Sequence, residues 1–157
     1  MSDPTAVSGP KRVTLEQMRE LVGRPFPGGT FTIERWENTL FTEVMECDPL
    51  PDDLAHPAYL FHAPLAGLGV TYGEIFEICH AESAEAIRAG EYRWVIHEPL
   101  RVGHTYGMSG AITGVERKAG RRAGKMYLVT FEIAVHEHQD DSPVATVVNT
   151  WIFLRSE

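Results

Sequence analysis

The chain contains only two cysteines, Cys47 and Cys79, and no C-x-x-C pair. Two such thiols cannot supply a structural zinc site or a disulfide framework, so we expect a reducing, cytoplasmic location. No run of ~18 apolar residues is present, which excludes an ordinary membrane-spanning helix. The first residues also lack an apolar segment that would serve as a secretory signal.

Several catalytic signatures are missing as well. The sequence has no glycine-rich phosphate fingerprint, no G-x-S-x-G motif and no convincing Ser/His/Asp order. His136 and His138 would project from one face of a strand and could hold a metal, but a third ligand is not evident nearby. We therefore expect no metal site and no cofactor.

Positive charge is scarce and unevenly placed. The net charge of −8 argues against a general affinity for nucleic acid or an anionic membrane. Five basic residues nevertheless fall within nine positions without an acid among them: Arg117, Lys118, Arg121, Arg122 and Lys125. This basic loop is either a solubilising hairpin tip or an edge that contacts the phosphates of a ligand or carrier.

The length and composition are those of one globular domain. At 157 residues, with 43% apolar and 23% charged residues, the chain can bury a sizeable core. Residues 1–12 are rich in Ser, Pro, Gly and Thr and are expected to form a disordered lead-in. We expect residues 13–157 to form a single domain.

Two helices are predicted before residue 50. Thr14 and Gln17 form a capping box at the start of the first, which Gly23 ends. In the second, over residues 34–46, Trp36 and Val44 bound one broad apolar stripe, the pattern of a helix that packs against a core. The proline-rich acidic segment 48–53 is a loop.

Residues 56–69 are almost free of charge and are apolar on nearly all sides, which predicts a buried helix. Its small residues would allow strands to approach closely, and Pro64 would kink it. A short helix is expected over residues 71–79. A last helical turn is expected over residues 83–89, closed by Gly90.

From residue 92 the period changes to two. Residues 92–97, 105–116, 127–135 and 144–154 are predicted strands with hairpin connections. The last is apolar on both faces and is expected to lie inside the sheet. One buried helix followed by a continuous antiparallel sheet predicts the α+β hot-dog fold, with the sheet wrapped around the central helix.

Three phrases resemble the MaoC-like hydratase/dehydratase branch of the hot-dog superfamily, in particular its fatty-acid-synthase-like N-terminal dehydratase subgroup. They are the helix phrase HPAYLFHAPLAGLG (56–69), the connection EPLRVGHTY (98–106) and the last-strand phrase VATVVNTW (144–151). The resemblance covers roughly residues 14–155. It implies a lyase of fatty-acid metabolism that adds or removes water on an acyl-CoA or an acyl-carrier thioester.

The family's catalytic Asp and His lie in a G-D-x-N-P-x-H motif before the helix. This sequence has DDLAHP (52–57) there, with a shorter spacing and no Asn-Pro pair. The resemblance transfers the catalytic pair to His56 with Asp53, Asp48 or Asp52. Each of these residues could equally cap a helix or form part of the loop.

Substrate-binding candidates come from three regions. They are Tyr59, His62 and Gly67 in the central helix, Asn149 in the last strand, and Arg117, Arg121 and Arg122 in the basic loop. In an α-helix His62 would lie about 600° of rotation from His56, on a different face. Tyr59, His62 and Asn149 could also be ordinary hydrogen-bonded core residues.

Three functions are compatible with these observations. The first is a hydratase or dehydratase that uses His56. The second is a non-catalytic subunit that completes the acyl site of a catalytic partner. The third is a thioesterase, because a fold does not determine the reaction. In each case an uncovered sheet edge predicts a homodimer, or a heterodimer with a second hot-dog subunit.

Overall fold

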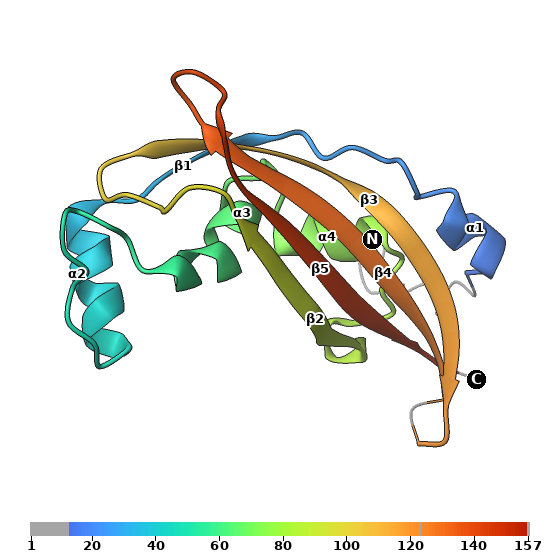
Figure 1. Cartoon of the computed structure of the whole chain (residues 1–157). Coiled ribbons are helices and arrows are strands. Elements are labelled where there is room, and N and C mark those ends of the chain that lie inside the picture. The colour runs from blue at the N-terminus through green and yellow to red at the C-terminus, as the bar shows by residue number, and fades with distance from the viewer. Residues whose placement is uncertain (1–12, 123, 157) are drawn as a thin grey trace, which may run out of the picture.

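The computed structural model describes residues 13–122 and 124–156, and the predicted disordered lead-in of residues 1–12 lies outside this part. A curved sheet of five antiparallel strands dominates it (Figure 1). The strands are β1 (Gly29–Thr32), β2 (Ile87–Ile96), β3 (Thr105–Gly120), β4 (Gly124–Glu137) and β5 (Pro143–Arg155), in the order β1-β3-β4-β5-β2. The sheet curves over short helical segments, which is the predicted hot-dog arrangement.

Buried and more exposed side chains alternate along β4 and β5, and the buried ones form the inner face of the sheet. On β4, every second residue from Tyr127 to Val135 is buried, as the sequence predicts. Alternate residues of β5 are buried from Val147 to Arg155, and this strand has a neighbour on each side. The prediction of an interior last strand is therefore confirmed.

The helical segments are shorter than predicted. They are α1 (Leu15–Arg19), α2 (Arg35–Val44), the 3-10 helix η1 (Pro57–Phe61), α3 (Ala63–Ala66), α4 (Tyr72–Ile78) and the 3-10 turn η2 (Ala84–Ala86). The predicted capping box of Thr14 and Gln17 begins α1. η1 and α3 carry the buried residues Tyr59, Leu60 and Leu65, so this region is interior.

The prediction of one continuous helix over residues 56–69 is wrong. The chain winds as η1, breaks at His62 and restarts as α3. Pro64 explains the break, because it has no N–H to donate to Leu60 in a continuous α-helix and its ring would clash there. In the first turn of a new helix that missing donor costs nothing.

The predicted helical turn over residues 83–89 is also wrong for most of its length. Only Ala84–Ala86 are helical, and β2 already begins at Ile87. Gly90 does not end a helix. It lies at a β-bulge between Ala89 and Glu91, where an added Cβ would come 2.6 Å from the carbonyl oxygen of Thr150.

The basic segment forms strand ends rather than a long loop. β3 continues to Gly120 and pairs with β4 from Gly124 onward, so Arg117, Lys118 and Lys125 belong to the ladder. Arg121 and Arg122 occupy the turn and are exposed. Alternation on the strands therefore decides which of these cations share a face.

Helix α2 is turned the opposite way from its apolar pattern. Trp36, Leu40 and Val44 are 65%, 52% and 82% exposed, whereas Asn38 and Thr42 are buried. The four-residue apolar spacing is present, but it faces away from this chain's core. α2 consequently turns Asn38 and Thr42 inward together with Phe41, and turns the rest of its apolar stripe outward.

Candidate functional site

The winding of η1 brings three predicted site residues together. In a 3-10 helix with three residues per turn, positions 56, 59 and 62 fall in line. His56 and His62, at the two caps of η1, both contact the ring of Phe41 on α2, with centroids 5.8 Å and 6.1 Å away. The prediction that His62 leans to a different face from His56 is therefore wrong, because it assumed α-helical rotation.

Tyr59 is the centre of this group. Its ring stacks on Phe41 at 4.6 Å between centroids and 27° between planes, and it lies 5.4 Å from the His62 ring. Phe31 of β1 meets the edge of His62 at 5.6 Å. We call this group, Phe31, Phe41, His56, Tyr59 and His62, the η1 cluster.

Two polar atoms beside the cluster have no partner among the described residues. The Tyr59 hydroxyl is fully buried without a hydrogen bond, and so is the Oδ1 atom of Asn38 on α2. Burial, assisted by the charge of Glu37, raises the pKa of Tyr59 to about 12. The phenol therefore keeps its proton at neutral pH and has a donor available for a ligand.

The two histidines differ in their environment. His56 caps η1, where its Nδ1 accepts a hydrogen bond from the Ala58 N–H at 3.2 Å. A neutral imidazole that accepts at Nδ1 carries its proton on Nε2. Burial lowers the pKa of His62, and the weaker opposing influence is the charge of Glu37. His62 is therefore neutral at pH 7 and able to accept a proton.

No carboxylate among the predicted acids contacts His56. Asp53 Oδ1 instead accepts from Arg35 Nη1 at 2.9 Å, and this hydrogen bond and charge lower the pKa of Asp53. Asp48 and Asp52 have exposed side chains. The segment is held by its backbone, since the Val102 N–H donates to the Asp53 carbonyl and the Ala55 N–H to the Leu100 carbonyl, both at 2.8 Å.

Sequence reasoning missed the contribution of α2. Phe41 lies within the predicted apolar stripe, but that stripe gave no reason to expect Glu37 and Asn38 on the inner side of the helix, where Glu37 acts on Tyr59 and Asn38 is buried. The available signal was the polar set Glu37, Asn38 and Thr42, which recurs at helical spacing. The resulting group places a neutral imidazole and a protonated phenol side by side, and the charge of Glu37 acts on both, but no carboxylate among the described residues pairs with either histidine.

Two other predicted substrate contacts lie inside the fold. Asn149 is 1% exposed on β5, directly across the ladder from Tyr92, and its Oδ1 has no partner among the described residues. Tyr92 contacts Phe61 of η1 at 4.9 Å, which brings Asn149 within the same region of the sheet as η1. Gly67 is packed so closely that an added Cβ would meet Met108 Cγ at 2.7 Å.

The predicted basic contacts do not join the η1 cluster in one chain. His56 lies beside the start of β3, where Leu54 bridges to Arg101, whereas Arg117, Arg121 and Arg122 lie at its far end. β3 has 16 residues, and at about 3.3 Å per residue a strand of that length spans roughly 50 Å if straight. One compact ligand therefore cannot reach both groups within this chain.

Other reactive side chains offer little chemistry. Burial raises the pKa of the Cys79 thiol to about 12, so it stays protonated and unreactive. Among residues 13–122 and 124–156, no group of three or more His, Cys, Asp or Glu side chains could hold a metal ion. No helix in that part is long and apolar enough to cross a membrane.

Comparison with known proteins identifies relatives only at the level of the fold. No protein-family model matches the sequence, and no curated protein is significantly similar to it. A chain of the ChsH1-ChsH2 complex from Mycobacterium tuberculosis matches with a TM-score of 0.69 and 14% identity, covering 91% of this chain and 90% of that one.

Two further solved structures support the same class. A chain of the C-terminally truncated HadBC complex, a 3R-hydroxyacyl-ACP dehydratase from Mycobacterium tuberculosis, has a TM-score of 0.64 at 17% identity, over 84% of this chain and 96% of that chain. A MaoC-like dehydratase has a TM-score of 0.68 at 14% identity, over 88% of this chain but 44% of that longer one. The chain has the hot-dog fold, and structures of MaoC-like dehydratases are among those that it resembles.

Proposed function

We propose that this chain is one subunit of a hydratase or dehydratase that acts on an acyl thioester, and that it works joined to a second hot-dog subunit. One observation carries the proposal. Asp53, the acid nearest in sequence to His56, is paired with Arg35, and no acid among the described residues takes its place beside His56. The pair that hydration needs is therefore completed by another chain.

The sheet provides an edge for that second chain. Within the described residues β2 has β5 as its single neighbour, and it is ten residues long. Its Val95 and Ile96 are 49% and 46% exposed, and Phe61 and Tyr72 beside it are about half exposed. A long edge strand that ends in exposed apolar residues is prone to pair with another strand, which supports an interface along β2.

The outward face of α2 supports the same interpretation. Trp36, Leu40 and Val44 expose apolar surface on a helix whose inner face carries the η1 cluster. A second subunit that covered α2 would also exclude water from the groups beneath it. The neighbours agree in kind, since two are named as complexes of two components and one of these as a hydroxyacyl-ACP dehydratase.

The chemistry expected of the η1 cluster follows from its protonation states. Hydration of a 2-enoyl thioester requires a base for water, a proton for the α-carbon and donors for the thioester oxygen as it gains charge. The Tyr59 hydroxyl is a donor that no described residue engages, and the neutral His62 can accept or relay a proton. In this proposal the cluster forms one wall of the site and the partner supplies the carboxylate.

The test compares the isolated chain with a complex. The chain is purified alone and also co-expressed with a hot-dog chain that carries the G-D-x-N-P-x-H motif, taken from the genes that adjoin its own. Loss of the conjugated-thioester absorbance of a short enoyl-CoA measures hydration. We expect activity only in the complex. Turnover by the isolated chain would overturn the proposal, as would a complex that releases free CoA instead of hydrating.

A second candidate is a hydratase complete in this chain alone, with His56 as its acid–base residue. The alignment of His56, Tyr59 and His62 on one face, with an unpartnered phenol between two imidazoles, favours it. This candidate predicts turnover without a partner and its loss in His56→Ala. The exposed His97 gives a matched His97→Ala control.

A further inference from the structure

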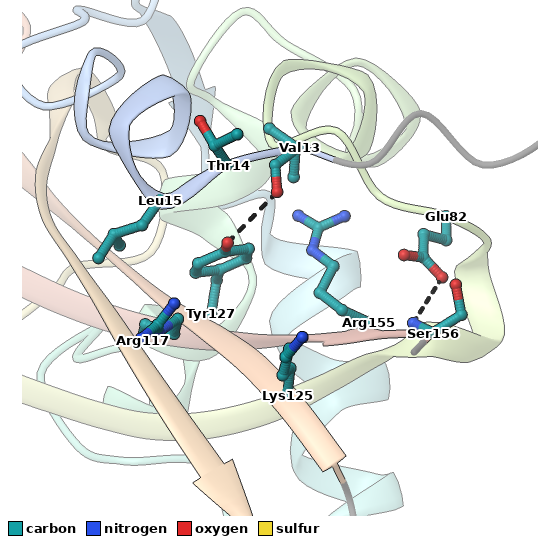
Figure 2. A pocket seen from close by; sticks show the side chains of 9 residues that line it. All are labelled: Val13, Thr14, Leu15, Glu82, Arg117, Lys125, Tyr127, Arg155 and Ser156. Carbon is teal, nitrogen blue, oxygen red and sulfur yellow. Dashed lines mark hydrogen bonds between the residues drawn. The ribbon is translucent and has the colours of Figure 1, made fainter.

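A pocket lies at the hairpin end of the sheet, away from the η1 cluster. The inference drawn from it does not depend on the function proposed above. The volume of the pocket is about 290 Å³, and it is lined by the ends of β3, β4 and β5 and the start of α1 (Figure 2). Arg117, Lys125 and Arg155 contribute three cations, and Glu82 is the single acid among the described lining residues. The described lining residues therefore carry an excess of two positive charges.

Arg155 is the unusual member of this set. It is 9% exposed, and no carboxylate of the described residues lies within ion-pair distance of it. Its Nη atoms donate to the carbonyls of His80 and Cys79, while its Nε is buried without any partner in the described part of the chain. Burial lowers the pKa of Arg155 and the charge of Glu82 opposes this only in part, so an anion in the pocket would further offset the cost of burying the guanidinium.

The strand register concentrates the charge further. Lys125 lies directly across the ladder from Arg155, and Arg117 lies across from Tyr127, over whose ring the Arg155 guanidinium sits at 5.2 Å. Like charges directly opposite on a sheet destabilise it unless something neutralises them. Glu82 is already engaged, since its carboxylate accepts from the Ser156 N–H at 3.0 Å.

Neighbouring basic residues are arranged differently. Lys118 lies 3.5 Å from the carboxylate of Glu116, on the same hairpin. Arg121 and Arg122 occupy the exposed turn and do not line the pocket. In Figure 2 the side chains of Arg117, Lys125 and Arg155 lie around the ring of Tyr127. The cations that line the pocket are thus a different set from the other basic residues of the hairpin.

We propose that this pocket binds the phosphate group of a small ligand. A phosphate monoester carries close to two negative charges at neutral pH, which matches the excess of the pocket. Arg117 and Lys125 are exposed and can meet the phosphate as it enters, and Arg155, which also lines the pocket, adds a third positive charge. The ligand is either free phosphate or a larger molecule with a terminal phosphomonoester.

Calorimetric titration of the full chain tests this site with two probes, inorganic phosphate and adenosine 3′,5′-bisphosphate, against sodium chloride at equal ionic strength. The test variant is Arg117→Gln/Lys125→Gln, and the matched control Arg121→Gln/Arg122→Gln removes the same charge from the same hairpin. All four positions are exposed, so both variants should fold, and circular dichroism checks this. We expect binding to weaken at least about tenfold in the test variant and less than about twofold in the control.

The Nε–H resonance of Arg155 gives an independent readout. It should shift when phosphate is added to the natural chain and stay unchanged in Arg117→Gln/Lys125→Gln. Tighter binding of the bisphosphate than of inorganic phosphate would identify a phosphomonoester ligand, and equal binding would identify the free anion. No binding of either probe, or equal weakening in both double variants, would overturn the proposal.

Discussion

His56 and His62 contact the same aromatic ring, that of Phe41, with centroids 5.8 Å and 6.1 Å from it. The contact joins the two ends of η1 to helix α2, although neither histidine is paired with an acid among the described residues. Phe41 also stacks on Tyr59 between them. Phe41 therefore holds the η1 cluster in register with α2.

Phe41→Ala should destabilise the protein by about 2 kcal/mol, because it removes a half-buried ring that three others contact. Trp36→Ala on the same helix is the control, since this residue is 65% exposed. It should cost the isolated chain about 0.5 kcal/mol or less. Urea unfolding measures both, and equal losses would contradict the observed orientation of α2.

Two glycine substitutions should act in opposite directions. At Gly67 an added Cβ would meet Met108 Cγ at 2.7 Å and Phe31 Cβ at 3.2 Å, so Gly67→Ala should cost roughly 1–3 kcal/mol by overpacking. At Gly73 in α4, the nearest atom would be Thr71 Oγ1 at 3.9 Å. Gly73→Ala should stabilise the helix by roughly 0.5–1 kcal/mol. Thermal unfolding should show a lower melting temperature for Gly67→Ala and a higher one for Gly73→Ala. An unchanged melting temperature for Gly67→Ala would show that α3 and β3 are less closely packed.

His62 should make stability depend on pH in a definite direction. Burial lowers the pKa of His62 below the ordinary 6.5. As the pH falls through 6.5, His62 therefore becomes protonated in the unfolded chain before it does in the folded chain. The free energy of unfolding should therefore fall as the pH drops through 6.5, and His62→Gln should flatten this slope. His97→Gln, at an exposed position, serves as the control.

The titration of the His62 ring protons by NMR gives the same information directly. A midpoint below 6.5 is expected. A midpoint above 6.5 would mean that the attraction of Glu37 outweighs burial, which would reverse the predicted slope.

Charge placed on β2 should weaken association. Val95→Lys puts an ammonium group on the exposed edge strand, where pairing with another chain would have to desolvate it. Val22→Lys is a matched change at a valine of similar exposure, 46% against 49%, outside the sheet. Light scattering after size exclusion of the complex with the second hot-dog subunit should show dissociation for Val95→Lys but not for Val22→Lys. Equal association of both variants would argue against β2 as the interface.

The sheet could be predicted from the sequence because its signal is local. The alternation from Tyr127 to Val135 required no knowledge of neighbours, and the double-sided apolar pattern of residues 144–154 identified an interior strand. The orientation of α2 could not be predicted in this way. Trp36, Leu40 and Val44 do form an apolar stripe, but a stripe does not say whether its partner is the same chain or another one.

The site was predictable in its members but not in its geometry. His56, Tyr59 and His62 were all identified, yet their common face depends on a 3-10 turn, and Pro57 at its start would suit the first turn of an α-helix equally well. Arg155 was missed altogether. A single arginine near the end of a strand has no sequence signal for burial, and only the register places it opposite Lys125.

The winding of η1 also constrains the length of this segment. Adding or removing one residue between His56 and His62 would rotate one imidazole by a third of a turn, about 120°. It would then leave the ring that both now share. Related chains that keep this arrangement should therefore keep Tyr59 and the number of residues between positions 56 and 62, whereas the other residues of the segment can vary.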